Sequence, residues 1–283
     1  MSNRSLPGGA CDVRAAHRRY SLAGFPRAYD QYRPKPPLVI LDILTQMARA
    51  PRAKAVVDLG SGTGLSTRIW ANRAELVIGI EPNTEMRQWA EKRNRRFAGW
   101  SRIQYQEGTS TRTNQRNGCA DIVTCAQSFH WMEPASTLAE IARILRGGGV
   151  FAAYDYLWPP TMDWEVEAAF HSMMPKARAI WHAKNFDKGM TWWPKEDRLA
   201  LFQASGHFAY VREVLIHHKV KGNANRLVGL VRSRGPIFTL LQHGYSEEEI
   251  GLDELRSVAE SLWGEREVPW YFSYRLCVGV RCR

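Results

Sequence analysis

Short apolar runs and longer amphipathic segments alternate along the first half of the chain. The apolar runs are rich in β-branched residues and end in glycine or polar residues, as in AKAVVDLGSG, AELVIGIEP, SRIQYQEG, CADIVTCAQ and GVFAAYDY. Such runs are typical of buried strands that enter turns. Apolar residues at helical spacing mark the segments around them, as in LVILDILTQMAR, GLSTRIWANR, NTEMRQWAEKRNRRFA and PASTLAEIARILRGGG. Strand and helix alternate through residue 156, which predicts a doubly wound, mostly parallel α/β sheet.

The remaining segments follow other patterns. Residues 1–24 are expected to be flexible, with a short helix across Val13 to Tyr20, and prolines are expected to keep FPRAYDQYRPKPP from being helical. Beyond residue 156, FAYVREVLIHHKV and VPWYFSYRLCVGVR predict two more strands, which makes seven. GNANRLVGLVRSRGPIFTLLQHG and SEEEIGLDELRSVAESLWG predict one helix each. Because no long linker divides the chain, we predict one domain over 25–283, with helical cap insertions at 157–205 and 222–264.

Composition and charge narrow the classes of function. The 283-residue chain carries a net charge of +11, which suits nucleic acid, an acidic membrane surface or a small anionic substrate. The excess comes mainly from scattered arginines, without an RNA-recognition or helix-turn-helix signature, so a nucleic-acid partner is not expected. The five cysteines form no C-x-x-C pair, so neither a metal site nor a disulfide framework is expected.

The same features indicate a compartment. The N-terminus lacks the apolar core of a signal peptide, and no apolar run is long enough to span a bilayer. Together with the cysteine pattern, this predicts a cytoplasmic protein without a membrane partner. The sequence leaves the oligomeric state open.

The turn Asp58-Leu59-Gly60-Ser61-Gly62-Thr63-Gly64 follows a buried strand and precedes a helix. Glycines in such a turn permit tight backbone angles and let a ligand lie against the main chain. The dinucleotide fingerprint G-x-G-x-x-G is a rival interpretation. It fails on spacing, because the third glycine comes one position early and Leu65 stands where that fingerprint needs glycine.

Glu81 ends the second predicted strand, in VIGIEP. The carboxyl ends of neighbouring parallel strands line one crevice, so this carboxylate is expected beside the glycine turn. A carboxylate in that place accepts hydrogen bonds from both hydroxyls of a ribose. A solvated strand end is the alternative interpretation of Glu81 taken alone.

These motifs resemble those of the class I S-adenosylmethionine-dependent methyltransferases. VVDLGSGTG looks like their first motif, GIEPNTEM like the acidic second motif, and ADIVTCAQSFHWME like the fourth-strand motif. EIARILRGGGVFAAYDY resembles the helix and strand that follow. YDQYRPKPP is similar to the lead segment of a small-molecule branch that includes the trans-aconitate methyltransferases. The resemblance covers roughly residues 25–156 and implies a Rossmann-like fold.

The resemblance also implies a set of residues that hold S-adenosylmethionine. Where the family often has an acidic residue after the third strand, this chain has Gly108-Thr109-Ser110-Thr111, whose hydroxyl or backbone groups would meet the adenine instead. Pro82 and Met86 would flank that ring. The full expected cofactor set is Tyr29, Arg33, Asp58, Gly60, Ser61, Gly62, Gly64, Glu81, Pro82, Met86, Thr109, Ser110, Ala126, Gln127 and Ser128.

His130 is the candidate catalytic residue. Methyl transfer from a sulfonium is an in-line displacement, so the protein must mainly align the nucleophile. An imidazole can also remove a proton from a phenol or an alcohol, whereas a carboxylate acceptor needs no base. The HW pair is therefore either a general base or part of the pocket wall, and the sequence leaves both open.

The aromatic residues are candidates for the acceptor side. We expect substrate contacts from Phe129, Trp131, Tyr154, Trp158, Trp192 and Trp193. Arg232 and Arg234 could pair with an acidic substrate, but a solvated helix face is the favoured interpretation for both. The predicted function is methyl transfer to a small organic acceptor, anionic or aromatic, most simply at a carboxylate or hydroxyl oxygen. An RNA methyltransferase and a non-catalytic cofactor-binding protein are the alternatives.

Overall fold

The computed structural model describes residues 20–96 and 99–283, and the predicted helix across Val13 to Tyr20 lies almost wholly outside them. A seven-stranded sheet forms the centre, in the order β3-β2-β1-β4-β5-β7-β6. Strand β7 runs antiparallel to both of its neighbours, and the other pairings are parallel. This confirms the predicted mostly parallel, Rossmann-like sheet. The strands are β1 (Ala53–Leu59), β2 (Ala74–Ile80), β3 (Ile103–Gln106), β4 (Ala120–Ala126), β5 (Leu145–Tyr156), β6 (Phe208–Gly222) and β7 (Val268–Arg281).

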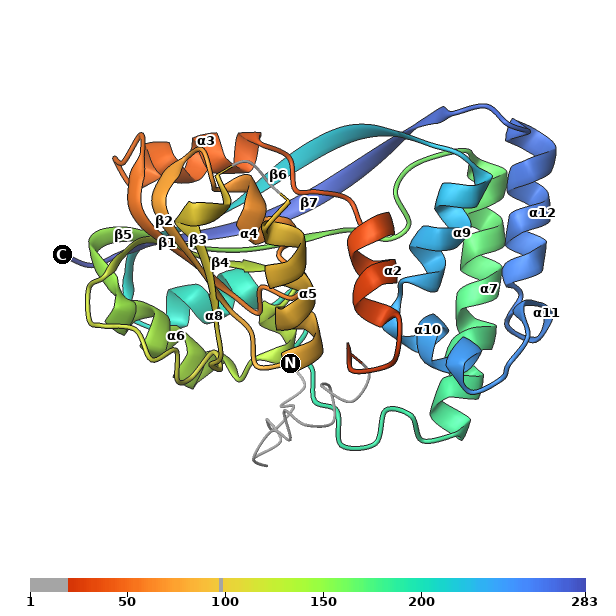
Figure 1. The fold of residues 1–283 in the computed structure, drawn as a ribbon, viewed down its shortest axis with the longest axis horizontal. Helices are drawn as coiled ribbons and strands as arrows, with labels where there is room; N and C mark the ends of the chain where they lie inside the picture. The colour runs from red at the N-terminus through yellow and green to blue at the C-terminus, as the bar shows by residue number, and fades with distance from the viewer. Residues whose placement is uncertain (1–19, 97–98) are drawn as a thin grey trace.

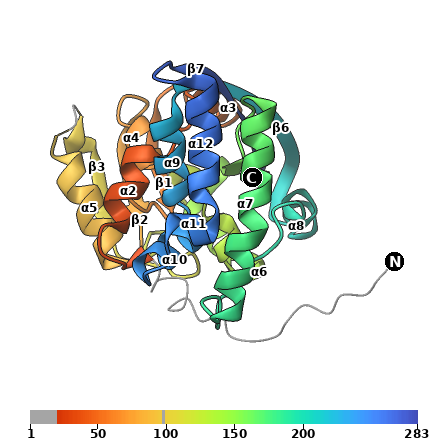
Figure 2. The same ribbon diagram turned by 90° about the vertical axis from the view of Figure 1, so that its right-hand side faces the viewer.

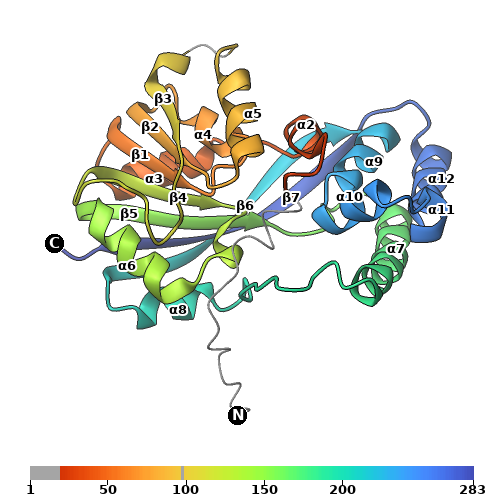
Figure 3. The same cartoon turned by 60° about the horizontal axis from the view of Figure 1, so that its bottom comes forward.

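Helices cover both faces of the sheet. One face packs against α3 (Val39–Met47), α4 (Leu65–Ile69) and α5 (Thr84–Asn94), and the opposite face against α6 (Pro134–Ile144) and α8 (Arg198–Ala204), as Figure 3 shows. Alternate residues of β1 pack on opposite faces of the sheet: Val56 belongs to one buried cluster and Val57 to the other. The period of two in a parallel strand covered on both sides explains why AKAVVDL reads as a nearly continuous apolar run.

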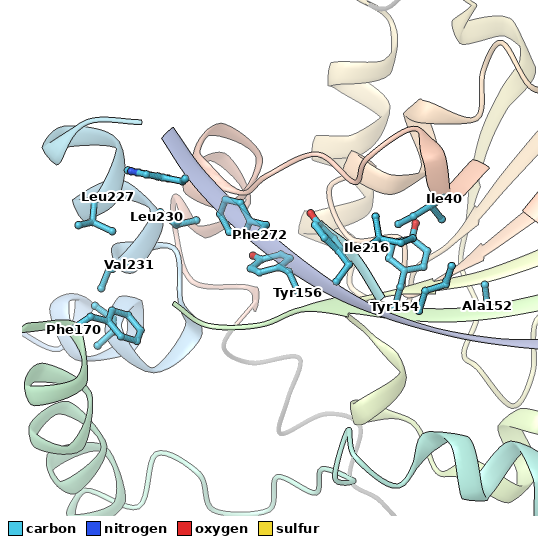
Figure 4. Packing of buried hydrophobic residues seen from close by; sticks show 14 of the residues in the cluster. Ile40, Ala152, Tyr154, Tyr156, Phe170, Ile216, Leu227, Leu230, Val231 and Phe272 are labelled. Carbon is cyan, nitrogen blue, oxygen red and sulfur yellow. The ribbon is translucent and has the colours of Figure 1, made fainter. Parts of the chain in front are cut away.

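A group of further helices lies beyond the carboxyl ends of the central strands (Figure 1). Three of them, α7, α9 and α12, stand side by side (Figure 2). The long strands β6 and β7 reach from the sheet to this cap, and one buried cluster continues along them (Figure 4). The cap helices are α2 (Phe25–Tyr32), α7 (Trp164–Ala183), α9 (Ala224–Arg232), α10 (Gly235–Gln242), α11 (Glu247–Ile250) and α12 (Leu252–Trp263).

The prediction that FPRAYDQYRPKPP is not helical was wrong. Pro26 occupies the first turn of α2, where its missing N–H costs no intrahelical hydrogen bond. The helix ends at Tyr32, and Arg33 adopts extended backbone just before Pro34. The prolines therefore bound this helix instead of preventing it.

Three predicted helices also have different ends. The helix expected over PASTLAEIARILRGGG stops at Ile144, because Leu145 is already extended and begins β5. Extended backbone at Arg234 separates α9 from α10. Gly251, with φ 75°, separates α11 from α12. No helix in the described part of the chain is long and apolar enough to cross a bilayer.

Candidate active site

A cavity of about 360 Å³ opens at the carboxyl ends of the central parallel strands. The turn after β1 and the end of β2 form one side of it, and the loop after β3 and the end of β4 form another. Residues from α2, the end of β5, the middle of β7 and the loop before α8 close it on the cap side. The cavity therefore lies where an open α/β sheet binds its ligand.

The turn after β1 needs glycine for two separate reasons. Gly60, Gly62 and Gly64 have φ values of 66°, 55° and 81°, in the left-handed region that side chains disfavour. A Cβ on Gly60 would lie 2.7 Å from the Cβ of Ser128, and one on Gly64 would lie 2.0 Å from the Tyr105 hydroxyl. Gly60 and Gly62 line the cavity, whereas Gly64 does not. Its role is to start α4 and to leave room for Tyr105.

Asp58 is fully buried beneath this turn and does not line the cavity. Its carboxylate accepts hydrogen bonds of 2.8 Å from the hydroxyls of Thr67 and Thr124. Burial raises the pKa of Asp58 to about 6, against the effect of these hydrogen bonds. Asp58 thus ties the end of β1 to α4 and β4 and supports the turn from beneath.

Glu81 lines the cavity beside the glycine turn. One carboxylate oxygen accepts a hydrogen bond from the Gly62 amide (2.8 Å), and the other accepts one from the Asn83 amide (2.9 Å). Burial raises the pKa of Glu81 to about 7, although these two amides favour the charged form. The Asn83 side chain caps α5 by accepting from the Met86 amide. The chain therefore positions the Glu81 carboxylate from two directions.

The end of β4 forms the floor of the cavity. Ala126, Gln127 and Ser128 all line it. The Ser128 hydroxyl donates to the Leu59 carbonyl (2.7 Å), and the Gln127 amide N–H donates to the Tyr154 carbonyl (2.9 Å). These bonds join the turn after β4 to both neighbouring strands.

His130 lies beside the cavity but is not among its lining residues. Its Nδ1 is 3.6 Å from Oδ1 of the buried Asp155, and its carbonyl accepts a hydrogen bond from the Trp193 amide (2.9 Å). Burial would raise the pKa of Asp155, but Lys195, Arg198 and His130 together hold it below its ordinary value. The imidazole is thus part of an ionic cluster that fixes the loop before α8.

The predicted acceptor residues divide into two groups. Trp131 and Tyr154 line the cavity. Phe129, in contrast, is buried against Phe151 and Phe202 on the sheet face covered by α6 and α8. The turn after β4 is a single 3₁₀ turn, and its curvature directs Phe129 into the core. The other tryptophans expected to contact the substrate also lie outside the lining: they are Trp158, Trp192 and Trp193.

Several residues that line the cavity were not predicted as site residues. Tyr156 and Tyr274 are directly paired across β5 and β7, so their rings share one face. The alternation in both strands carried this signal, since Tyr156 follows Tyr154 by two positions. Others are Tyr20, Pro34, Pro36, Thr63, Leu65, Ser66, Thr111, Met132, Glu133 and Thr191.

The two arginines assigned to a solvated helix face have different environments. Arg232 is exposed and pairs with Glu247, as predicted. For Arg234 the prediction was wrong, since its Nε and Nη1 are buried. Arg33 lines the cavity, donates to the Tyr156 hydroxyl (2.6 Å) and donates twice to Ser233.

Comparison with known proteins adds a family to this geometry. Residues 57–153, which include the glycine turn, Glu81 and the floor of the cavity, match the family model described as a methyltransferase domain. The segment that carries the glycine turn, Glu81 and the floor of the cavity therefore resembles the class I methyltransferases. The cofactor of this class is S-adenosylmethionine.

The relatives of this methyltransferase domain agree in class. The chain is 29% identical over 136 residues to the probable S-adenosylmethionine-dependent methyltransferase CRG1 of Saccharomyces cerevisiae, a match that covers 48% of this chain and 46% of that protein. It is 33% identical over 122 residues to an uncharacterized methyltransferase of Mycobacterium tuberculosis, covering 43% and 46%. The chain thus spans about half the length of the curated relatives it matches. These names specify no acceptor, so the trans-aconitate branch stays a prediction.

Solved structures support the fold. A proposed type II methyltransferase from Anaeromyxobacter dehalogenans superposes with a TM-score of 0.63 at 19% identity, covering 89% of this chain and 98% of that one. The YcgJ protein of Bacillus subtilis gives a TM-score of 0.52 at 16% identity, covering 86% and 98%. Both superpositions cover most of the chain and show that its fold resembles these two structures.

The cavity of the methyltransferase domain fits an adenosyl group on its own geometry. Gly60, Ser61 and Gly62 line the cavity, so the main chain of the turn borders the space that a ligand would occupy. Glu81 faces the same space with an acceptor suited to ribose hydroxyls. Pro82, Met86, Thr109 and Ser110 line the same cavity with apolar and hydroxyl side chains.

The pKa of Glu81 gives a testable pH dependence. The ionised carboxylate accepts hydrogen bonds from ribose hydroxyls, and protonation removes part of that capacity. Since burial raises this pKa to about 7, the affinity for S-adenosylmethionine should fall as the pH is lowered through 7. Below pH 7, we expect the affinity to fall by up to about tenfold per pH unit. Calorimetric titration between pH 5.5 and 8.5 measures it.

The matched control is Glu81→Gln, which keeps the shape of the side chain without the charge. Its affinity should be lower and nearly independent of pH over the same range. A second variant, Asp58→Asn, removes the other buried carboxyl group with a raised pKa, which is about 6. If the pH dependence of the affinity disappears in Asp58→Asn and persists in Glu81→Gln, the titrating group is Asp58. That result would contradict the prediction for Glu81.

Proposed function

We propose that this protein transfers a methyl group from S-adenosylmethionine to an oxygen atom of a small organic acceptor, foremost a carboxylate. The observation that carries the proposal is the set of titratable groups around the cavity. Burial raises the pKa of Tyr29, Tyr154 and Tyr274 above the ordinary value, so these phenols stay protonated at neutral pH. Among the described residues, no histidine or lysine lines the cavity. A carboxylate acceptor needs no base.

The remaining carboxylate groups on the lining support the same view. Glu81 is engaged with two backbone amides. Glu133 caps α6, and although burial opposes it, hydrogen bonds from Ser136 and Ala135 lower its pKa. A carboxyl with a lowered pKa is a weak base. An acceptor that is already nucleophilic at neutral pH therefore suits this cavity better than an amine or an alcohol.

The size and walls of the cavity favour a small molecule. Its volume of about 360 Å³ lies in the range of small-molecule sites. The cap side is closed by aromatic rings of Tyr29, Tyr156 and Tyr274. These rings would exclude water and hold an apolar part of the acceptor in line with the reacting group.

This arrangement suggests a separate role for each group of residues around the cavity. When bound, S-adenosylmethionine supplies an electrophilic methyl group, so the protein needs alignment more than activation. Glu81 would hold the ribose, the glycine turn and Ala126 to Ser128 would support the rest of the cofactor, and Trp131 and Tyr154 would border the acceptor. We also propose that residues 25–156 hold the cofactor, that the insertions at 157–205 and 222–264 shape the acceptor side, and that the protein is cytoplasmic.

A panel of acceptors tests the proposal. Methyl-labelled S-adenosylmethionine is incubated with the protein and with aliphatic and aromatic carboxylic acids, phenols, amines and short RNAs. We expect labelled methyl esters, or methyl ethers from phenols, with S-adenosylhomocysteine formed in equal amount. Label transferred solely to amines or to RNA would contradict the proposal.

The role of His130 is tested on two classes of acceptor. Because its ring lies against Asp155 and outside the cavity lining, His130→Ala should slow transfer to carboxylic acids and to phenols by the same modest factor, about tenfold or less. Initial rates with both acceptor classes measure it. A loss of about 100-fold or more confined to phenols would instead identify His130 as a general base.

A further inference from the structure

Arg234 is a buried cation that is not among the residues expected to hold the cofactor. Its Nε and Nη1 are buried without a hydrogen-bond partner in the described part of the chain. Burial, and next the positive charge of Arg33, lowers its pKa to about 9. A further charged neighbour, Arg178, is also a cation. The guanidinium therefore lies in a place where an anion would be strongly favoured.

Aromatic rings surround this guanidinium. Its central carbon lies 4.2 Å from the ring centroid of Trp158 and 5.7 Å from that of Phe170. Cation–π contacts stabilise the charge but accept none of the N–H donors in the guanidinium plane. Figure 4 shows Phe170 on the cap side of Tyr156, and Tyr154 on the sheet side. The rings thus explain the position of the cation and leave its hydrogen-bonding capacity open.

Arg234 is linked to the cavity through Arg33. The guanidinium carbon of Arg33 lies 5.1 Å from the same Trp158 ring, and Arg33 lines the cavity. Arg33 donates to the Tyr156 hydroxyl and to Ser233, the residue before Arg234. Its hydrogen bonds therefore go to neutral groups. Arg234 is not itself a lining residue, so Arg33 brings one positive charge to the cavity and Arg234 places a second close behind it.

We propose that Arg234, with Arg33 beside it, forms the subsite for an anionic group of the methyl acceptor. This inference rests on the proposed methyl transfer and specifies its acceptor as an anion with an apolar or aromatic part. A guanidinium binds a carboxylate or a phosphate through parallel hydrogen bonds. Tyr156, which lines the cavity, would border the remainder of the acceptor, and Trp158 and Phe170 pack against the Arg234 guanidinium behind it. The carboxylate of the cofactor could bind a guanidinium in the same way. The experiment therefore distinguishes an anion of the acceptor from the carboxylate of the cofactor.

The test uses the full chain saturated with S-adenosylhomocysteine. Benzoate, phenyl phosphate and the neutral isostere benzamide are titrated by calorimetry into the wild type, Arg234→Gln and the control Arg232→Gln, whose arginine is exposed. The wild type and the control should bind the better anion at least about tenfold more tightly than benzamide. Arg234→Gln should lose that preference, with benzamide binding and S-adenosylhomocysteine affinity unchanged.

Thermal unfolding of the ligand-free protein gives a second test. A buried cation without an anion destabilises the fold, so Arg234→Met should raise Tm by a few degrees, whereas Arg232→Met should not. A lower Tm for Arg234→Met would mean that Arg234 is a structural residue, which would overturn the inference.

The other outcomes are equally decisive. Equal binding of anions and benzamide by the wild type, or no binding of either anion, contradicts the subsite. A drop in S-adenosylhomocysteine affinity in Arg234→Gln that matches the drop for the anions would assign the cation to the cofactor carboxylate, against the inference. Normal S-adenosylhomocysteine binding by the wild type in any of these cases leaves the proposed methyl transfer standing.

Discussion

Replacing Glu81 by alanine is expected to weaken binding of S-adenosylmethionine by at least about 100-fold. Two hydrogen bonds from ribose hydroxyls to the charged carboxylate would be lost, each worth about 1.5–3 kcal/mol. The same change removes the acceptors of the Gly62 and Asn83 amides, so the glycine turn and the start of α5 would also be less well held. Calorimetric titration at pH 8, where the carboxylate is ionised, measures the effect.

The matched control for this prediction is Glu107→Ala. Glu107 follows β3 at the same edge of the sheet, but its side chain is 74% exposed and pairs with Arg87. Its removal should leave cofactor affinity unchanged. Wild-type affinity in a folded Glu81→Ala variant would contradict the assignment of the ribose to Glu81.

Replacing Asp155 by alanine is expected to lower the free energy of unfolding by about 3–5 kcal/mol. Asp155 is buried and pairs with Lys195 and with Arg198, whose side chain is only 4% exposed. Without the carboxylate, the Arg198 charge would remain buried and unpaired. Urea unfolding followed by circular dichroism measures the change.

A double variant separates the ion pair from simple loss of packing. Asp155→Leu with Arg198→Met removes both charges and fills the space, so most of the lost stability should return. Lys195→Ala should lower the free energy of unfolding only slightly, since the side chain of Lys195 is partly exposed. A loss below about 1 kcal/mol in Asp155→Ala would show that the cluster around His130 contributes little to the fold.

The central strands and the cofactor side of the site could be predicted because their signals are local. A β-branched run followed by glycines defines the end of β1, and the parallel sheet then fixes which edge Glu81 shares with that turn. The positions of Gly60, Gly62 and Glu81 around one cavity follow directly. Local spacing was sufficient here because the fold repeats one simple crossover.

The acceptor side could not be predicted in the same way. The direction of Phe129 depends on a single 3₁₀ turn after β4, and the pairing of Tyr156 with Tyr274 joins residues more than a hundred positions apart. Arg234 looks like a surface residue in sequence, and becomes buried because extended backbone there ends α9 beside Trp158. Such contacts depend on how the cap packs against the strands.

Parallel calorimetric titrations with S-adenosylmethionine and NAD test the central claim most directly. S-adenosylmethionine should bind with one site per chain, and NAD should give no binding heat. Leu65 follows a glycine turn whose spacing differs from the dinucleotide fingerprint, and Glu81 faces a cavity sized for a small ligand. Binding of NAD without binding of S-adenosylmethionine would contradict the account.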